Sequence, residues 1–227
     1  MEKIVISLGG SVLVPGDEDG RYLAELSELL RDVSSSVKVF AVTGGGRVAR
    51  YYIETGRALG LRERVLDEYG IAVTRLNARL LAAALRGLAN REPAHTYAEA
   101  AKLSRRHRVV VMGGTRPGHT TDRVSASLAR IVGASRIVNA TSVDGVYTAD
   151  PRRDPSARRL DRISFGELVR LSGVAHRAAG PSVVFDPIAA RVLARDRTPL
   201  SVVHGRDLTA LRRAILGLPF DGTLVGD

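Results

Sequence analysis

Short apolar runs rich in valine and isoleucine alternate with helical patterns along nearly the whole chain. Residues 3–8 (KIVISL) precede a helical pattern at 22–33, and residues 37–42 (VKVFAV) precede another at 47–59. This alternation is typical of βαβ units, in which helices connect buried parallel strands. It predicts an α/β fold with a mainly parallel central sheet. Further strands are expected at 108–112, 136–141 and 199–203, and further helices at 72–88, 125–132, 187–194 and 208–216.

The length and composition favour one large domain. A chain of 227 residues is short for two full domains, and a hydrophobic content of 44% is enough for a sizeable core. No apolar run is long enough to cross a membrane, and the beginning, MEKIVISLGG, lacks a signal-peptide pattern. We therefore expect a cytoplasmic protein with no membrane partner. The absence of cysteine excludes disulfides and thiolate metal sites.

The positive charge of the chain raises the question of nucleic-acid binding. The formal net charge is +10, but the basic residues are scattered, and the two dense clusters (SRRHR and DPRRDPSARRLDR) are interrupted by acids or by helical patterns. Six tyrosines, four phenylalanines and no tryptophan leave few rings on which bases could stack. Solvated basic faces are therefore the favoured interpretation, and no nucleic-acid partner is expected.

Glycine-rich or polar loops follow the expected strands. They read GGS, TGGG, MGGTRPG, TSVDG and HG in chain order. The carboxyl ends of parallel strands meet at one edge of a sheet, which is where open α/β folds bind ligands. Glycine lets a backbone approach a phosphate closely, and loop amides supply donors to it. The sequence thus predicts a phosphate or nucleotide site at this edge.

Two familiar nucleotide motifs do not account for these loops. TGGGRVAR contains Gly44-x-Gly46-x-x-Ala49, which satisfies the dinucleotide fingerprint and makes an NAD-dependent oxidoreductase a competitor. That fingerprint belongs in the first strand–helix turn, with an acid ending the next strand, whereas here a long helix-like region follows through Leu88. No glycine precedes a Lys-Ser or Lys-Thr pair, so the sequence excludes a P-loop kinase.

The stretch NATSVDGVYTADP combines groups that suit a nucleotide and its magnesium ion. It places Thr141, Asp144, Tyr147 and Asp150 after one expected strand. An isolated aspartate such as Asp144 is more often a turn former than a catalyst. His119, in the loop TRPGHTT, is expected to form hydrogen bonds rather than to act as an acid or base, because phosphoryl transfer needs little proton chemistry.

The motifs GGSV, TGGGRVAR, GGTRPGHTTD and VDGVYTADP, in this order, resemble those of the amino acid kinase family. Within that family, the chain looks most like the archaeal type of uridylate kinase. The resemblance implies a three-layer αβα sandwich formed by a single domain, residues 1–227, with the acceptor nucleotide mostly in the N-terminal half and ATP mostly in the C-terminal half. It also implies transfer of the γ-phosphate of ATP to UMP, giving UDP and ADP in pyrimidine nucleotide biosynthesis, with Mg²⁺ accompanying ATP and a homohexamer built as a trimer of dimers.

The resemblance carries roles onto matching residues. Catalysis is expected from Gly10, Ser11, Arg50 and Asp144, and no residue is assigned as a metal ligand. ATP contacts are expected from Gly9, Gly10, Ser11, Gly46, Arg50, Thr141, Tyr147 and Asp150. UMP contacts are expected from Gly45, Asp67, Thr115, Arg116, Pro117, Gly118, His119, Thr120 and Thr121.

One position departs from the family pattern. Many relatives have a lysine two residues before the first glycine pair, where its cation stabilises the phosphoryl group in flight, and this chain has Ser7 there. Magnesium, Arg50 or a cluster of backbone amides could replace that charge. Two other functions stay open: a sister kinase with another phosphate or carboxylate acceptor, and a non-catalytic module that binds nucleotides or nucleic acid.

Overall fold

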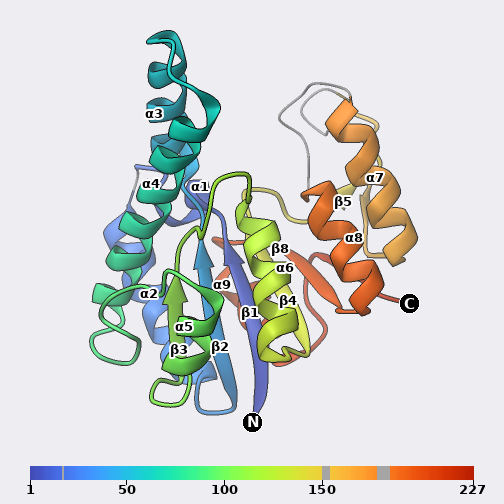
Figure 1. Ribbon diagram of the computed structural model, residues 1–227. Helices are drawn as coiled ribbons and strands as arrows, with labels where there is room; N and C mark the ends of the chain where they lie inside the picture. Colours follow the sequence, from blue (N-terminus) through green and yellow to red (C-terminus); the bar gives the residue numbers. More distant parts are fainter. Residues whose placement is uncertain (17, 150–153, 178–184) are drawn as a thin grey trace.

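The computed structural model describes residues 1–16, 18–149, 154–177 and 185–227, without the side chains of 174–177. A seven-stranded sheet forms its centre, in the order β3-β2-β1-β4-β8-β9-β7 (Figure 1). Strands β3, β2, β1, β4 and β8 are mutually parallel, and β9 is antiparallel to β8 and parallel to β7. The strands are β1 (Glu2–Leu8), β2 (Val37–Thr43), β3 (Val109–Met112), β4 (Arg136–Thr141), β7 (Arg162–Ile163), β8 (Leu200–His204) and β9 (Thr223–Val225); β5 (Val146–Tyr147) and β6 (Arg159–Leu160) form a separate antiparallel pair.

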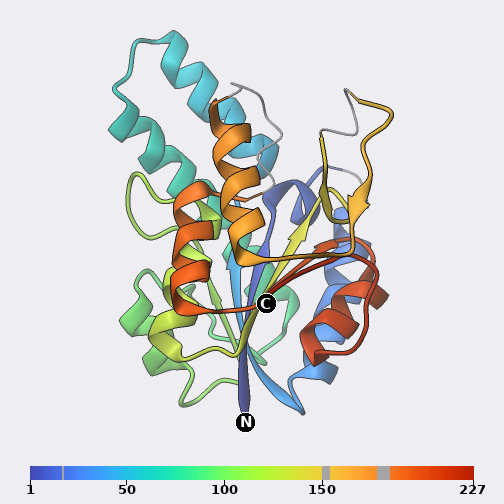
Figure 2. The same cartoon turned by 90° about the vertical axis from the view of Figure 1, so that its right-hand side faces the viewer.

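Helices cover both faces of the sheet, which confirms the three-layer αβα architecture. Helices α2, α4 and α9 pack on one face, and α5, α6 and α8 pack on the other, so that Figure 2 shows the sheet between α8 and α9. The helices are α1 (Gly10–Leu13), α2 (Asp19–Val33), α3 (Gly46–Ala58), α4 (Glu63–Ala84), α5 (Tyr97–Leu103), α6 (Thr121–Val132), α7 (Phe165–Arg177), α8 (Pro187–Asp196) and α9 (Leu208–Leu216).

The side-chain alternation of the central strand divides the core into two halves. Ile4, Ile6 and Leu8 belong to the cluster under α2, α4 and α9, and Val5 belongs to the cluster under α6 and α8. Because successive side chains of a strand point to opposite faces, Ser7 shares the face of Val5 and lies on the α6 side. This register brings a buried hydroxyl close to the start of α6.

The predicted elements are confirmed, although several boundaries differ. All five predicted strands form, and α9 has the predicted bounds. Helix α4 begins at Glu63 rather than at residue 72, because Gly70 is accommodated inside the helix instead of ending it. Helix α6 begins four residues earlier than predicted, since the Thr120 hydroxyl caps its first turn. The short elements α5, β5, β6, β7 and β9, and the helix α7, are not predicted from the sequence.

The carboxyl ends of the parallel strands form one level edge. Leu8 lies opposite both Thr43 and Ala140, and Thr141 lies opposite His204. The loops after these strands therefore converge, as the sequence predicts. Helix α3 and the first half of α4 project beyond the same edge as a helical hairpin (Figure 1).

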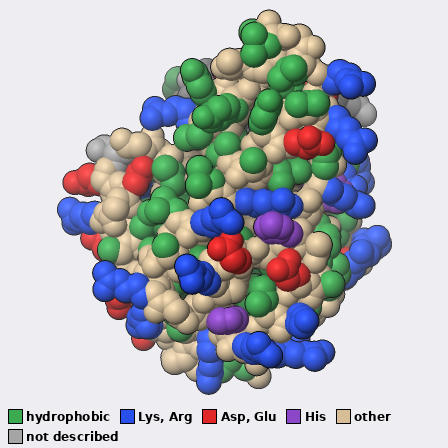
Figure 3. All heavy atoms as spheres, turned by 60° about the vertical axis from the view of Figure 1, so that its left-hand side comes forward, with side chains coloured by type: hydrophobic (Ala, Val, Ile, Leu, Met, Phe, Trp, Pro, Cys, Tyr) green, Lys and Arg blue, Asp and Glu red, His purple; other side chains and the backbone are tan. Residues whose placement is uncertain are grey.

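The projecting hairpin exposes large apolar side chains. Figure 3 shows hydrophobic side chains gathered on the upper part of the molecule, where α3 and α4 lie. Tyr51 is 65% exposed and Leu59 is 75% exposed. In the part of the chain that the structure describes, no helix is long and apolar enough to cross a membrane. The apolar patch consists of Val48, Tyr51, Tyr52, Leu59, Tyr69, Leu76 and Leu80.

Candidate active site

The first two glycine loops touch through their backbones. A Cβ added to Gly10 would lie 2.2 Å from the Gly46 nitrogen, and a Cβ added to Gly46 would lie 2.4 Å from the Gly10 carbonyl carbon. Gly46 also has a φ of 62°, in the left-handed region that favours glycine. No other residue fits at either position without moving the two loops apart. The predicted gathering of GGS and TGGG is therefore confirmed.

Polar groups of α4 form hydrogen bonds that position the glycine loops. Asn77 donates from Nδ2 to the carbonyl of Gly44 at 2.8 Å. The Thr74 hydroxyl accepts from the Gly114 amide at 2.7 Å, and the Thr74 carbonyl accepts from the Thr43 hydroxyl at 2.8 Å. Sequence reasoning missed Thr74 and Asn77. Their signal was present, because both are polar residues on the otherwise apolar, buried face of a helix.

The loop TRPGHTT, residues 115–121, is fixed by two side chains of α4. The Gly118 amide donates to Oδ2 of Asp67 at 2.7 Å, across 51 residues of sequence. Arg75, which the sequence analysis did not single out, donates from Nε to the Gly114 carbonyl at 3.1 Å and from Nη2 to the Thr115 carbonyl at 3.4 Å. The structure thus brings Asp67 to the loop with which the sequence analysis grouped it.

His119 is held in a form that accepts a hydrogen bond. Arg116 donates from Nε to Nε2 of His119 at 2.9 Å, while Nδ1 is buried and has no partner among the described residues. Burial, followed by the positive charges of Arg123 and Arg116, lowers the pKa of His119 below its ordinary value. His119 thus forms a hydrogen bond within the loop, as the sequence analysis expects of it.

The starts of α6 and α8 are tied together at the same edge. The Thr120 hydroxyl accepts from the Arg123 amide at 3.2 Å and donates to Oδ2 of Asp186 at 3.0 Å. The other oxygen of Asp186 accepts from the amides of Ile188 and Ala189, both at 2.8 Å. Thr120 and Asp186 therefore each cap one helix, and their contact fixes the two helix starts relative to each other.

Asp122 is a further site residue that the sequence analysis did not identify. Its Oδ1 accepts from the Ser7 hydroxyl at 3.4 Å, and its Oδ2 accepts from the Asp186 amide at 3.1 Å. Burial raises the pKa of Asp122 to about 6, and the neighbouring Asp186 carboxylate adds to the effect. Ser7 and Asp122 are 115 residues apart, so only the tertiary structure shows that they meet. The contact places a carboxylate beside the position where many relatives have a lysine.

Asp144 and Tyr147 lie together after β4. The Tyr147 hydroxyl donates to Oδ1 of Asp144 at 2.8 Å, and Nη1 of Arg159 donates to Oδ2 at 3.0 Å. Burial works to raise the pKa of Asp144, but these hydrogen bonds outweigh it and keep the pKa below its ordinary value. Both oxygens of Asp144 thus hold the β5–β6 pair in place. Asp150, also expected here, lies outside the described residues.

The remaining residues expected to bind ATP lie around the first glycine loop. The Gly9 amide donates to the Ala140 carbonyl at 2.9 Å, which joins this loop to the end of β4 next to Thr141. Ser11 is in the first turn of α1, and Arg50 is an exposed residue of α3, one turn after Gly46. The described residues contain no group of three or more His, Asp or Glu side chains that could hold a metal ion.

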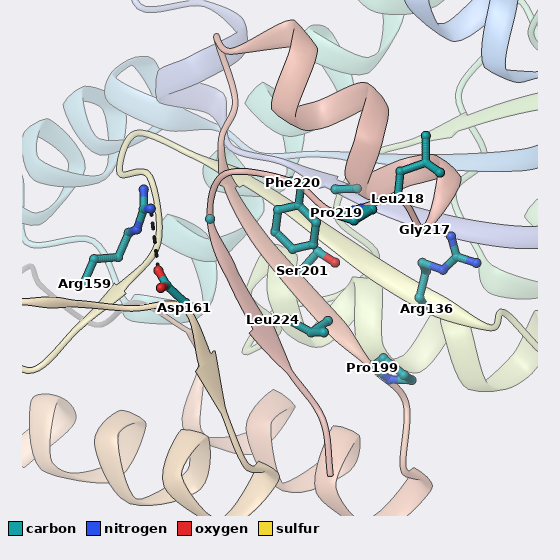
Figure 4. Close-up of a pocket in the computed structure, with 12 residues that line it drawn as sticks. Arg136, Arg159, Asp161, Pro199, Ser201, Gly217, Leu218, Pro219, Phe220 and Leu224 are labelled. Carbon is teal, nitrogen blue, oxygen red and sulfur yellow. Dashed lines mark ion pairs between the residues drawn. The ribbon is translucent and has the colours of Figure 1, made fainter.

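A cavity of about 700 Å³ lies elsewhere, between α9, β8 and β9 (Figure 4). Its walls are mainly apolar, and include Leu218, Phe220 and Leu224. Arg136 and Arg159 also line it, but they form ion pairs with Glu2 and Asp221, respectively. The chemistry for binding phosphate lies instead at the glycine loops, where backbone amides and glycine contacts converge.

The raised pKa of Asp122 predicts a stability cost at neutral pH. The folded protein holds this proton up to about pH 6, whereas the unfolded chain releases it near 3.8, so the free energy of unfolding falls as the pH rises between these values. Asp122→Asn keeps the shape without the charge. We expect it to raise the free energy of unfolding at pH 7.5 by up to about 3 kcal/mol, and to have little effect below pH 4.

Urea unfolding at a series of pH values measures this effect. Glu54→Gln, which removes an exposed carboxylate from α3, is the matched control and should follow the wild type throughout. If Asp122→Asn has the same pH dependence of unfolding as the wild type, or is less stable than the wild type at pH 7.5, the prediction is wrong. The buried Asp122 carboxylate then does not lower the stability of the folded protein at neutral pH.

Known proteins resemble this chain over nearly its full length. A model of the amino acid kinase family matches residues 2–204. The uridylate kinase of Methanocorpusculum labreanum is 45% identical over 228 residues, covering 100% of this chain and 97% of that protein. The uridylate kinase of Methanoculleus marisnigri is 46% identical over 225 residues, covering 99% of this chain and 96% of that protein.

Solved structures agree with the sequence relatives. The crystal structure of uridylate kinase from Archaeoglobus fulgidus superposes with a TM-score of 0.89 at 41% identity, and covers 100% of both chains. The UMP kinase of Bacillus anthracis has a TM-score of 0.81 at 21% identity over 100% of this chain and 96% of its own, and this likeness concerns the fold alone. The chain belongs to the amino acid kinase family.

Proposed function

We propose that this protein is a UMP kinase, which transfers the γ-phosphate of ATP to UMP and produces UDP and ADP. The observation that carries the proposal is the identity of 45% to 46%, over essentially full length, to relatives that are named uridylate kinases. The converging glycine loops support it independently, because they offer backbone donors at the edge of the sheet where phosphates bind. A cytoplasmic location is part of the same proposal, since both substrates are nucleotides.

On the donor side, we assign ATP to the loops after β1, β2 and β4. Gly9, Gly10 and Ser11 would cradle its phosphates, with Gly46 and Arg50 beside them. Thr141, Tyr147 and Asp150 would line the base and ribose. Magnesium would be bound mainly by the ATP phosphates, and would neutralise charge on the transferred group.

On the acceptor side, we assign UMP to the loop held by α4. Asp67 and Gly45 would face the nucleotide, and residues 115–121 would enclose its phosphate. The support is geometric, since Asp67 bonds the loop at Gly118 and the arginine side chains of Arg116 and Arg123 flank His119. Two anions would thereby be held on adjoining loops, and positioning of this kind provides much of the catalysis in phosphoryl transfer.

The negative charge on the transferred phosphoryl group would be stabilised without the lysine that many relatives have. Ser7 is neutral, so magnesium, the amides of the first glycine loop and Arg50 would stabilise the phosphoryl group in flight. For the carboxylate that organises the centre there are two candidates. Asp144 matches the family pattern, and its two oxygens accept from Tyr147 and Arg159, just as those of Asp122 accept from Ser7 and the Asp186 amide. Asp122 lies beside Ser7, and its position favours it for this part.

The proposal is tested by ADP formation with magnesium-ATP against UMP, CMP, dUMP, AMP, isopentenyl phosphate and acetylglutamate. We expect strong and selective turnover with UMP. Turnover with a different acceptor would favour the sister kinase and would leave only the donor assignments. Tight nucleotide binding with no turnover for any acceptor would favour the non-catalytic module.

Asp67 gives a sharper test of the acceptor site. In Asp67→Asn, the amide oxygen can still accept from Gly118, but the negative charge that faces the acceptor is lost. We expect the KM for UMP to rise about tenfold or more while the KM for ATP stays within about twofold, because the change removes an acceptor contact only. Steady-state kinetics with each substrate varied in turn measures both constants.

Glu68→Gln is the control for this change. Glu68 is the next residue of α4 and forms an exposed ion pair with Arg64. Its KM values should match those of the wild type. An equal loss for ATP and UMP in Asp67→Asn would place Asp67 outside the acceptor site.

The assembly we propose is a homohexamer built as a trimer of dimers, as the family resemblance implies. The apolar patch on α3 and α4 supports burial against another copy, because exposed patches of this kind usually mark interaction sites. Sedimentation equilibrium would test it, and a monomer mass at micromolar concentration would contradict it.

A further inference from the structure

The segment after β8 contacts helix α1 and the end of strand β4. It lies beyond residue 204, where the match to the family model ends. The Gly205 amide donates to the Thr141 carbonyl at 2.8 Å, and a Cβ at Gly205 would lie 2.5 Å from Cγ1 of Val12 in α1. The backbone of this segment therefore packs directly on α1, which begins within the loop Gly9–Ser11 that we assign to the ATP phosphates.

The side chain of Arg206 joins three parts of the structure. Its Nε donates to the carbonyl of Val12 at 3.3 Å, and its Nη2 donates to Oδ1 of Asp19, in the first turn of α2, at 3.0 Å. Its guanidinium carbon lies 4.8 Å from the centre of the Tyr22 ring. A planar guanidinium can make these contacts at once, because its donors and its flat face point in different directions.

The partners of Arg206 are themselves held in place. The Tyr22 hydroxyl donates to the Gly205 carbonyl at 2.8 Å, and burial raises the pKa of Tyr22, so this donor keeps its proton. The second oxygen of Asp19 accepts from the Gly16 amide at 2.9 Å, in the turn between α1 and α2. Arg206 is thus the centre of a clasp formed by Val12, Asp19, Tyr22 and Gly205.

Helix α1 depends on such outside contacts. It has four residues, too few for an isolated helix to be stable. Its beginning is fixed where Gly10 packs on Gly46, and its end is fixed where Arg206 binds the Val12 carbonyl. The orientation of the amides of Gly10 and Ser11 therefore depends on contacts at both ends.

We propose that Arg206 is a positioning residue for the phosphate donor. It holds α1 so that the amides of Gly10 and Ser11 face the phosphates of ATP, without touching ATP itself. This rests on the proposed function only in assigning ATP to that loop. The acceptor loop is held separately, by Asp67 and Arg75 of α4, so loss of the clasp affects the donor and leaves UMP binding unchanged.

The test compares Arg206→Ala, Arg206→Lys and the control Arg212→Ala in the full chain. Arg212 belongs to the same C-terminal segment and pairs with Asp32 of α2, but that contact lies away from α1. The Kd of magnesium-ATP is measured by calorimetry, and the KM values for ATP and UMP by steady-state kinetics. Thermal unfolding tests whether each variant is folded. If Arg206→Ala is not folded, the comparison is made with Arg206→Lys alone.

We expect Arg206→Ala to raise the Kd and KM for ATP about tenfold, with the KM for UMP within about twofold of the wild type. Arg206→Lys should recover part of the loss, because lysine keeps the charge but cannot make the stacked and forked contacts together. Arg212→Ala should equal the wild type. An unchanged Kd for ATP in Arg206→Ala, or a parallel rise in both KM values, would overturn the proposal.

The two hypotheses fail in different ways. If the wild type binds ATP but does not phosphorylate UMP, the proposed function is wrong, and the Kd of ATP still decides the role of Arg206. If the wild type turns over UMP and the Arg206 variants bind ATP normally, only the role of Arg206 is wrong. No binding of ATP by the wild type would overturn both.

Discussion

The contact between Gly10 and Gly46 is the constraint on which the rest of the site depends. Two chain segments cross with no side chain between them, because a Cβ on either glycine would lie within 2.4 Å of the other backbone. The contact is possible because β1 and β2 are adjacent and in register, with Leu8 opposite Thr43. It places the starts of α1 and α3 together, so two sets of loop amides face one space. A phosphate site at this edge follows from close approach of backbones rather than from charged side chains.

Buried polar groups of α4 transmit this geometry to the rest of the edge. Thr74 and Asn77 form hydrogen bonds to the backbones of Gly114 and Gly44, which lie in the loops after two different strands, β3 and β2. Buried hydrogen bonds of this kind are costly to leave unmade, so they select one arrangement of the loops. Ser7 and Asp122 contribute differently. A partly buried carboxylate whose pKa is raised costs stability at neutral pH, as expected of a group kept for function rather than for folding.

The C-terminal segment completes the donor side. Arg206 reaches back to α1 and α2, and Thr223 accepts from the Val146 amide at 2.8 Å, next to the Asp144–Tyr147 pair. Arg159 links the same region to Asp221 through an ion pair. Residues outside the matched family region thus brace the loops after β1 and β4, whereas α4 braces the loops after β2 and β3.

The sequence by itself determined the α/β class, the five parallel strands, the glycine loops at one edge and the family. The class, the strands and the loops follow from local patterns, since apolar runs and glycine clusters act within a few residues, and the family follows from the resemblance of the motifs. It also grouped Asp67 with the loop at Gly118 through the family resemblance. Only the tertiary structure decided that Asp122 meets Ser7, that Arg75 and Asn77 hold the loops, and that Arg206 contacts Val12. Each of these contacts joins residues more than 30 positions apart, and no local pattern in a single sequence encodes which distant side chains will meet.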